Sequence, residues 1–195
     1  MTSRALGAMI AAVILSLGSA ASSALRPAQA DTVTIGGPFS LTDMHGRSVS
    51  ERSYHDKWLL VYFGYTFCPD ACPTVLNTFG QVLDQLGAEA AKVQPLFISV
   101  DPDRDTVPVL AKYMTSFDPR IMGLTGSPAA IAAVADEYGA EFQSHKTAAN
   151  PDNYTVDHSV YVYLMNPTGK FVRGFNYDAS PDEMASGVRK ALVAE

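Results

Sequence analysis

Both cysteines of the chain lie in the stretch GYTFCPDACP, where three residues separate Cys68 from Cys72. This spacing is one residue longer than the redox motif C-x-x-C. An apolar run precedes the cysteines and a helical pattern follows Pro73, so we expect them at a helix N-terminus. Unpaired backbone N–H groups and the positive end of the helix dipole favour the thiolate there, which attacks disulfides and binds soft metals.

The cysteine pair alone is compatible with three uses: a structural disulfide, a redox couple or a pair of metal ligands. Disulfides are common in exported proteins, but closing so short a loop stabilises a domain little. A thiol–disulfide reductase remains open as the enzymatic alternative. A peroxidase with Cys68 as nucleophile is disfavoured, because Val61 and Tyr65 occupy the Pro and Thr positions of the pattern Pro-x-x-x-Thr-x-x-Cys.

A metal site would need a third ligand, and His158 is the best candidate. It lies in the sequence VDHS directly before a predicted strand, so we expect it at the edge of the sheet, where it could face the cysteines. A hydrogen-bonded loop histidine is the alternative. His45, His55 and His145 are expected at the solvated surface. Two thiolates and one imidazole favour copper, especially Cu(I), with Cu(II) tolerated, whereas structural zinc prefers four ligands.

Five charged residues could support this site or dock a partner: Asp70, Asp101, Asp103, Arg104 and Asp157. The loop from 101 to 105 follows a predicted core strand and should lie at the same end of the sheet as the cysteines. Capping of the next helix by Asp105 or Thr106 is an equally good interpretation of that loop. For Asp70 and Asp157 the default expectation is a solvated surface position.

The elements that must position these residues follow from the apolar periodicity. Strands are predicted at residues 39–42, 48–50, 58–63, 96–100, 121–124, 160–165 and 171–175. Helices are predicted from Pro73 to about Lys92, around 109–117, after the N-cap Ser127 and after the capping box 180–183. A polar stretch, 144–155, interrupts the pattern. The order predicts an α/β, thioredoxin-like fold with a mixed central sheet flanked by helices and an N-terminal β-hairpin.

Composition divides the 195 residues into a leader and one domain. Residues 1–30 contain Arg4, Arg26 and an uncharged run between them, which predicts a signal peptide or an N-terminal membrane anchor. Residues 31–195 then carry 12 basic and 20 acidic side chains, a net charge of −8. An acidic domain without basic runs is a poor candidate for binding nucleic acid or anionic lipid. Because residues 1–30 predict export, we expect a periplasmic domain that is soluble or anchored by its N-terminal segment.

Several motifs in order resemble the SCO/SenC family of copper-binding, thioredoxin-like assembly factors for cytochrome c oxidase. They are the cysteine stretch, the sequence ISVDPDRDT at 98–106, the segments FDPR at 117–120 and GLTG at 123–126, and VDHS at 156–159. Such a series, which extends over almost the whole exported domain, is far more specific than one C-x-x-x-C motif.

The resemblance implies that Cys68, Cys72 and His158 bind one copper ion. It implies a metallochaperone that receives copper from an upstream donor and delivers it to the binuclear copper site of oxidase subunit II. The thiols must be reduced to hold copper, and a reducing activity towards the cysteines of the target subunit has also been proposed for the family. The same cysteine pair would serve both activities, so the resemblance leaves an enzymatic role undecided.

Overall fold

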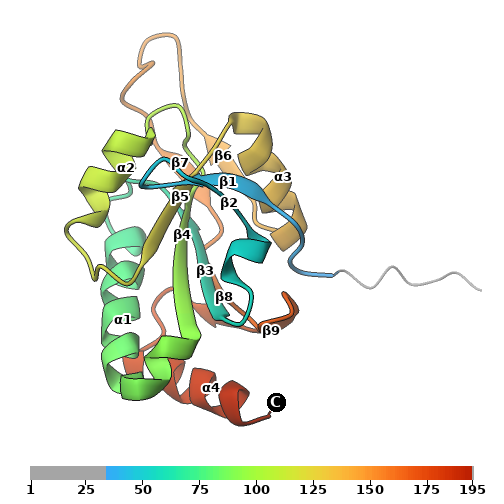
Figure 1. Ribbon diagram of the computed structural model, residues 1–195. Helices are drawn as coiled ribbons and strands as arrows, with labels where there is room; N and C mark the ends of the chain where they lie inside the picture. The colour runs from blue at the N-terminus through green and yellow to red at the C-terminus, as the bar shows by residue number, and fades with distance from the viewer. Residues whose placement is uncertain (1–33, 195) are drawn as a thin grey trace, which may run out of the picture. The chain divides into compact units, whose positions relative to one another are not determined.

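A seven-stranded mixed sheet organises residues 34–194, the part of the chain that the computed structural model describes (Figure 1). The strand order is β2-β1-β5-β4-β3-β8-β9. The strands are β1 (Ser40–Asp43), β2 (Ser48–Ser50), β3 (Trp58–Gly64), β4 (Val93–Ser99), β5 (Met122–Thr125), β8 (Tyr161–Met165) and β9 (Phe171–Asn176). The pairs β3–β4 and β4–β5 are parallel, and the other pairs are antiparallel.

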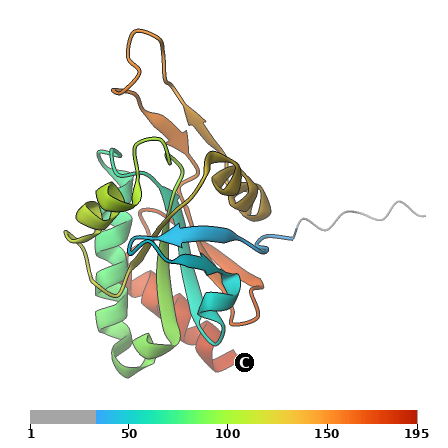
Figure 2. The same cartoon turned by 45° about the horizontal axis from the view of Figure 1, so that its top comes forward.

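Helices cover the sheet. They are α1 (Ala71–Leu86), α2 (Val107–Met114), α3 (Pro128–Tyr138) and α4 (Pro181–Ala194), with two short 3₁₀ helices, η1 (Glu51–Tyr54) and η2 (Gly87–Lys92). Figures 1 and 2 show α1, α2 and α4 on one side of the sheet and α3 on the other. This arrangement, with the β1–β2 hairpin at one edge, is the thioredoxin-like fold expected from the sequence.

The core explains why β3 lies at the centre of the sheet. All seven residues of β3 are buried, as expected for a strand covered on both faces. Helix α1 packs an apolar face that repeats at helical spacing on this sheet: Val75, Leu76, Phe79, Val82, Leu83 and Leu86. Each such side chain contributes about 1.5–3 kcal/mol of burial free energy. The rigid unit thus formed fixes the start of α1 against the end of β3.

The polar stretch 144–155 is flanked by two short strands that the sequence did not indicate. Residues Phe142–Ser144 form β6 and Val156–His158 form β7, and the two pair as an antiparallel ribbon outside the main sheet. The ribbon and its connecting loop project beyond the helices in Figures 1 and 2. The prediction that His158 lies at the edge of the main sheet is therefore wrong, because the residue ends a separate strand.

The helix boundaries also differ from those predicted. Helix α1 starts at Ala71, so Pro73 is its third residue rather than its first. Proline is still accepted there, because backbone N–H groups in the first turn have no hydrogen-bond acceptor within the helix. The helix ends at Leu86 because Gly87 has a φ of 57°, a conformation that glycine adopts readily. The continuation to Lys92 is a 3₁₀ helix, and Phe117 lies beyond the end of α2.

Residues 34–194 contain no helix that is both long and apolar enough to cross a bilayer. The leader predicted at residues 1–30 lies outside the described residues.

Candidate metal centre

The cysteine turn is built between the end of β3 and the first turn of α1. Cys72 is the second residue of α1 and is fully buried, whereas Cys68 precedes the helix and is 9% exposed. The Cys68 N–H donates to the Tyr65 carbonyl at 3.2 Å, which closes the turn. The predicted position of the thiols at a helix N-terminus is confirmed.

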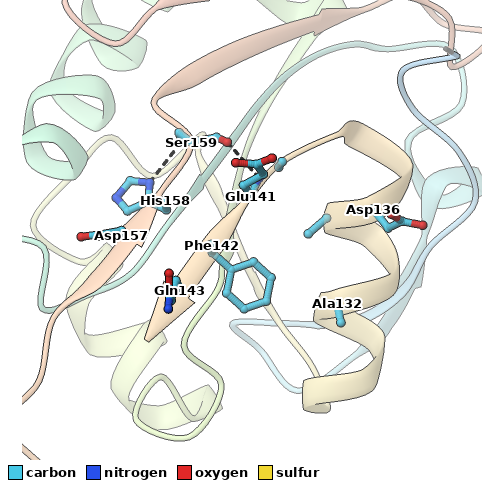
Figure 3. A pocket seen from close by; sticks show the side chains of 10 residues that line it. Ala132, Asp136, Glu141, Phe142, Gln143, Asp157, His158 and Ser159 are labelled. Atoms are coloured by element: carbon cyan, nitrogen blue, oxygen red, sulfur yellow. Dashed lines mark hydrogen bonds between the residues drawn. The ribbon is translucent and has the colours of Figure 1, made fainter. Parts of the chain in front are cut away.

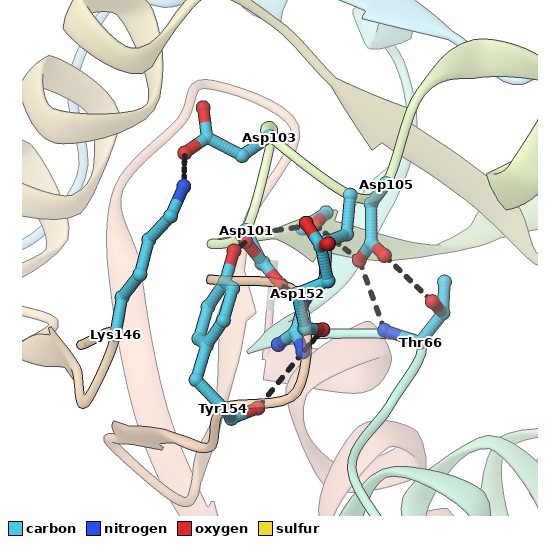
Figure 4. Close-up of polar contacts among 9 residues, drawn as sticks. Thr66, Asp101, Asp103, Asp105, Lys146, Asp152 and Tyr154 are labelled. Carbon is cyan, nitrogen blue, oxygen red and sulfur yellow. Dashed lines mark hydrogen bonds and ion pairs between the residues drawn. The ribbon is translucent and has the colours of Figure 1, made fainter. Parts of the chain in front are cut away.

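A buried carboxylate fixes the start of this turn. Asp105 accepts hydrogen bonds from the Thr66 N–H at 2.9 Å, from the Thr66 hydroxyl at 2.6 Å and from the Ser99 hydroxyl at 2.6 Å (Figure 4). The N-cap of α2 is Thr106, whose side chain makes no capping hydrogen bond. Thr106 thus occupies the predicted N-cap position but does not cap α2 through its side chain, and the Asp105 carboxylate instead joins the cysteine turn to the end of β4.

Three ligand atoms converge beside the turn. The sulfurs of Cys68 and Cys72 and a ring nitrogen of His158 all lie within 4.8 Å of one another. The Cys72 Sγ is 3.8 Å from the His158 Nε2. Residues 86 apart in sequence thus meet at one point, and both cysteines are reduced.

The contacts of the imidazole orient it for binding a metal. The His158 Nδ1 lies 3.1 Å from the Ser159 carbonyl oxygen, to which only a protonated nitrogen can donate. In the neutral ring this leaves the lone pair of Nε2 directed at the sulfurs, the arrangement usual for metal-binding histidines. Tyr62 and Tyr65 flank the ring edge-on, with centroid distances of 5.9 and 5.7 Å. The orientation of His158 is therefore set before any ion is bound.

The thiol pair shares one proton. A hydrogen bond from the Cys72 thiol lowers the pKa of Cys68 to about 3, against the effect of burial. The backbone N–H groups of Asp70 and Cys72 also favour the Cys68 thiolate. The same hydrogen bond, together with burial, raises the pKa of Cys72. One sulfur is ionised and the other can release its proton when a cation arrives.

The buried tyrosines around the cysteines were not identified from the sequence. The hydroxyls of Tyr62 and Tyr113 are buried and have no hydrogen-bond partner among residues 34–194. Burial, followed by the charge of the nearby cysteines, raises the pKa of both tyrosines. In the sequence these residues have the spacing of ordinary core aromatics, so the periodicity did not indicate that they lie beside the thiols.

An open cavity of about 650 Å³ reaches the site from outside, between α3 and the β6–β7 ribbon (Figure 3). His158 and Asp157 lie on its ribbon side, and Asp136 lies on α3. His158 therefore borders this cavity, while Cys72 is covered by the core.

The charged candidates fall into two groups. Asp70 is exposed, and Asp157 is exposed and paired with His145 at 2.8 Å, which agrees with the default expectation for both residues. Asp101 and Arg104 are instead largely buried and paired with each other at 2.5 Å. Of the loop residues proposed for partner docking, Asp103 alone is exposed.

The donor set fits a soft cation better than zinc. Of the described residues, only these two cysteines and one histidine form a group of three or more potential metal ligands. Structural zinc takes four protein ligands, whereas two thiolates with one imidazole suit copper.

Known proteins resemble this chain in sequence. The family model for SCO1/SenC matches residues 27–193. The chain belongs to the SCO1/SenC family. It is 42% identical over 160 residues to the bovine mitochondrial protein SCO2 homolog, covering 81% of this chain and 60% of that protein. The chain therefore spans less than two thirds of the length of this curated relative.

Solved structures of SCO1/SenC relatives share the fold. Arabidopsis thaliana ScoI with copper bound is 39% identical, with a TM-score of 0.76 over 83% of this chain and 99% of that one. Bradyrhizobium japonicum ScoI with copper bound is 44% identical, with a TM-score of 0.73 over 80% of this chain and 98% of that one.

Gly64 provides a test of how closely this SCO1/SenC site is packed. A Cβ at Gly64 would lie 2.5 Å from the Cys72 sulfur and 2.7 Å from the buried Phe97 ring. We expect Gly64→Ala to destabilise the copper-free chain by about 1–3 kcal/mol, because the core must shift to admit the methyl group. Urea unfolding measures this, with Gly80→Ala in α1 as control.

The control variant meets only Asp118, at 3.3 Å, and alanine favours a helix. Equal stabilities of the two variants would show that the sulfur has room to move.

Proposed function

We propose that this chain is a copper metallochaperone that delivers copper to the binuclear site of cytochrome c oxidase subunit II during oxidase assembly. The observation that carries the proposal is the convergence of two sulfurs and one imidazole within 4.8 Å in a member of the SCO1/SenC family. The chain binds copper, as do relatives at 39% and 44% identity that were solved with the metal. Cys68, Cys72 and His158 would be its three ligands.

The chemistry of this set suits transfer as well as binding. Cys68 offers a thiolate and Cys72 becomes one by losing its proton, so together they satisfy a soft monovalent cation. His158 adds a neutral third ligand, which also permits Cu(II). Because His158 borders an open cavity and the site has only three ligands, an incoming ligand of a partner could reach the ion and replace the protein ligands one at a time.

The proposed setting is outside the cytoplasmic membrane, with residues 1–30 acting as signal peptide or anchor. There the domain would meet an upstream copper donor and the oxidase subunit. The net charge of −8 in residues 31–195 is compatible with a cationic partner surface.

The delivery step can be tested by mixing the reduced, copper-loaded chain with copper-free subunit II and following the absorption of its binuclear centre. We expect the centre to form with the wild-type chain and to form poorly with His158→Ala. His55→Ala is a matched control, because His55 is exposed and lies outside the group of three. Equal yields from free copper and from the loaded chain would overturn a delivery role.

A thiol–disulfide reductase is the second candidate, favoured by the ionised Cys68 beside a proton-bearing Cys72. This pair could attack a disulfide of a partner and then close its own disulfide, releasing the partner's two thiols. Disulfide exchange needs no imidazole ligand. Reductase turnover that is retained without copper binding, for example in His158→Ala, would favour the second function.

A further inference from the structure

The ligand-bearing ribbon has to be held in place by contacts outside the main sheet. His158 ends β7, which pairs only with β6 in a two-stranded sheet. Isolated two-stranded ribbons are marginally stable in water. At the base of the ribbon, Ser159 and Glu141 exchange two hydrogen bonds of 2.9 Å, but these join the strands to each other. Besides its short link to β8, which begins at Tyr161, and the ring contacts of Tyr62 and Tyr65, the position of His158 relative to the thiols therefore depends on contacts of the ribbon with the cysteine side.

Arg104 makes such contacts. Its Nη1 donates to the Tyr154 carbonyl at 2.8 Å and to the Asp152 carbonyl at 3.4 Å, both on the segment that leads into β7. Its guanidinium lies 3.5 Å from the centre of the Tyr154 ring and 4.6 Å from that of Phe67, the residue before Cys68. Its Nε pairs with Asp101 at 2.5 Å. One side chain thus touches the ribbon segment, the cysteine turn and the loop after β4.

Asp101 completes the connection. Its carboxylate accepts a hydrogen bond of 2.6 Å from the Tyr154 hydroxyl, so Tyr154 is bound to Asp101 and Arg104 together (Figure 4). The side chain of Asp101 is 4% exposed and that of Arg104 is 11% exposed, so solvent screens this pair weakly. The nearby Lys146–Asp103 pair at 3.2 Å is exposed on both sides and should contribute little.

We propose that Arg104 and Tyr154 are positioning residues for copper, which hold the His158 ribbon against the cysteine turn. This inference rests on the proposed three-ligand site and adds how the site is kept assembled. Asp101 and Arg104 then stabilise contacts within the protein and do not dock a partner. Arginine is required because its planar group can stack on Tyr154 while donating from its edge, which a lysine ammonium cannot do.

The test is a double-mutant cycle of Arg104→Lys and His158→Ala, with Cu(I) affinity measured by competition in the reduced full-length chain. We expect Arg104→Lys alone to lower the affinity by roughly 10–100-fold, the effect typical of residues that orient a metal ligand. In the His158→Ala background the same substitution should cause almost no further loss, because it acts through the imidazole. An undiminished loss in that background would overturn the proposal.

Two further measurements keep the outcomes distinct. Arg120→Lys is the matched control, because this arginine also pairs with carboxylates, those of Asp84 and Asp118. The affinity of this variant for Cu(I) should equal that of the wild type. In the copper-free chain, NMR signals of the His158 ring should shift in Arg104→Lys. Unchanged ring signals would refute the positioning role. If His158→Ala alone left the affinity unchanged, the ligand assignment would fail, and the ring signals would still decide the role of Arg104.

Discussion

Replacing Cys72 with alanine is expected to abolish stoichiometric Cu(I) binding, and Cys68→Ala should do the same. Loss of a direct ligand should exceed the roughly 10–100-fold loss caused by removing a supporting residue. The remaining sulfur and imidazole would make a two-ligand site, and Cys72 contributes the sulfur that is fully buried. Copper content after dialysis against a competing chelator measures the effect.

The fold should tolerate these changes, which separates copper loss from unfolding. Cysteine and alanine are both small, and α1 keeps its apolar face in either variant. Thermal unfolding of the copper-free variants should remain cooperative. Full copper occupancy in either cysteine variant would contradict the ligand assignment. The sulfurs lie within 4.8 Å of each other, so the wild-type thiols can be oxidised to a disulfide. Oxidation should abolish copper binding, as replacing both cysteines would.

Removing the Asp105 carboxylate is expected to cause the largest loss of stability among single changes near the site. Asp105→Ala deletes three hydrogen bonds and leaves the Thr66 N–H and the Thr66 and Ser99 hydroxyl donors without their acceptor around a fully buried position. Unpaired buried groups cost about 1–3 kcal/mol each, so the free energy of unfolding should fall by about 3 kcal/mol. Urea unfolding at neutral pH measures it.

Asp105→Asn should be much milder, because an amide can accept from two donors and donate to the Thr66 hydroxyl. The pH dependence gives a sharper test. Burial raises the pKa of Asp105, so folding favours its neutral form. The stability of the wild type relative to Asp105→Asn should therefore be greatest in acid and decrease as pH rises from the ordinary aspartate pKa through the raised one. A relative stability that increases with pH would contradict this account.

The strands, the helices and the grouping of two cysteines with one histidine were largely predictable because each carries a signal in the sequence. The apolar run of β3 and the helical spacing of α1 placed the cysteine turn, and the family motifs singled out His158. The β6–β7 ribbon was missed since its strands have three residues each, too few for periodicity. Tyr154 and the linking role of Asp105 depend on contacts 39 to 53 residues apart, which no local pattern encodes.

The most direct test of the central claim is X-ray absorption spectroscopy at the copper edge of the reduced, copper-loaded chain, compared with His158→Ala. The account predicts two sulfur atoms and one imidazole nitrogen around the copper of the wild type, and loss of the imidazole signal in the variant. Identical spectra for the two proteins, with sulfur as the only protein ligand, would contradict it.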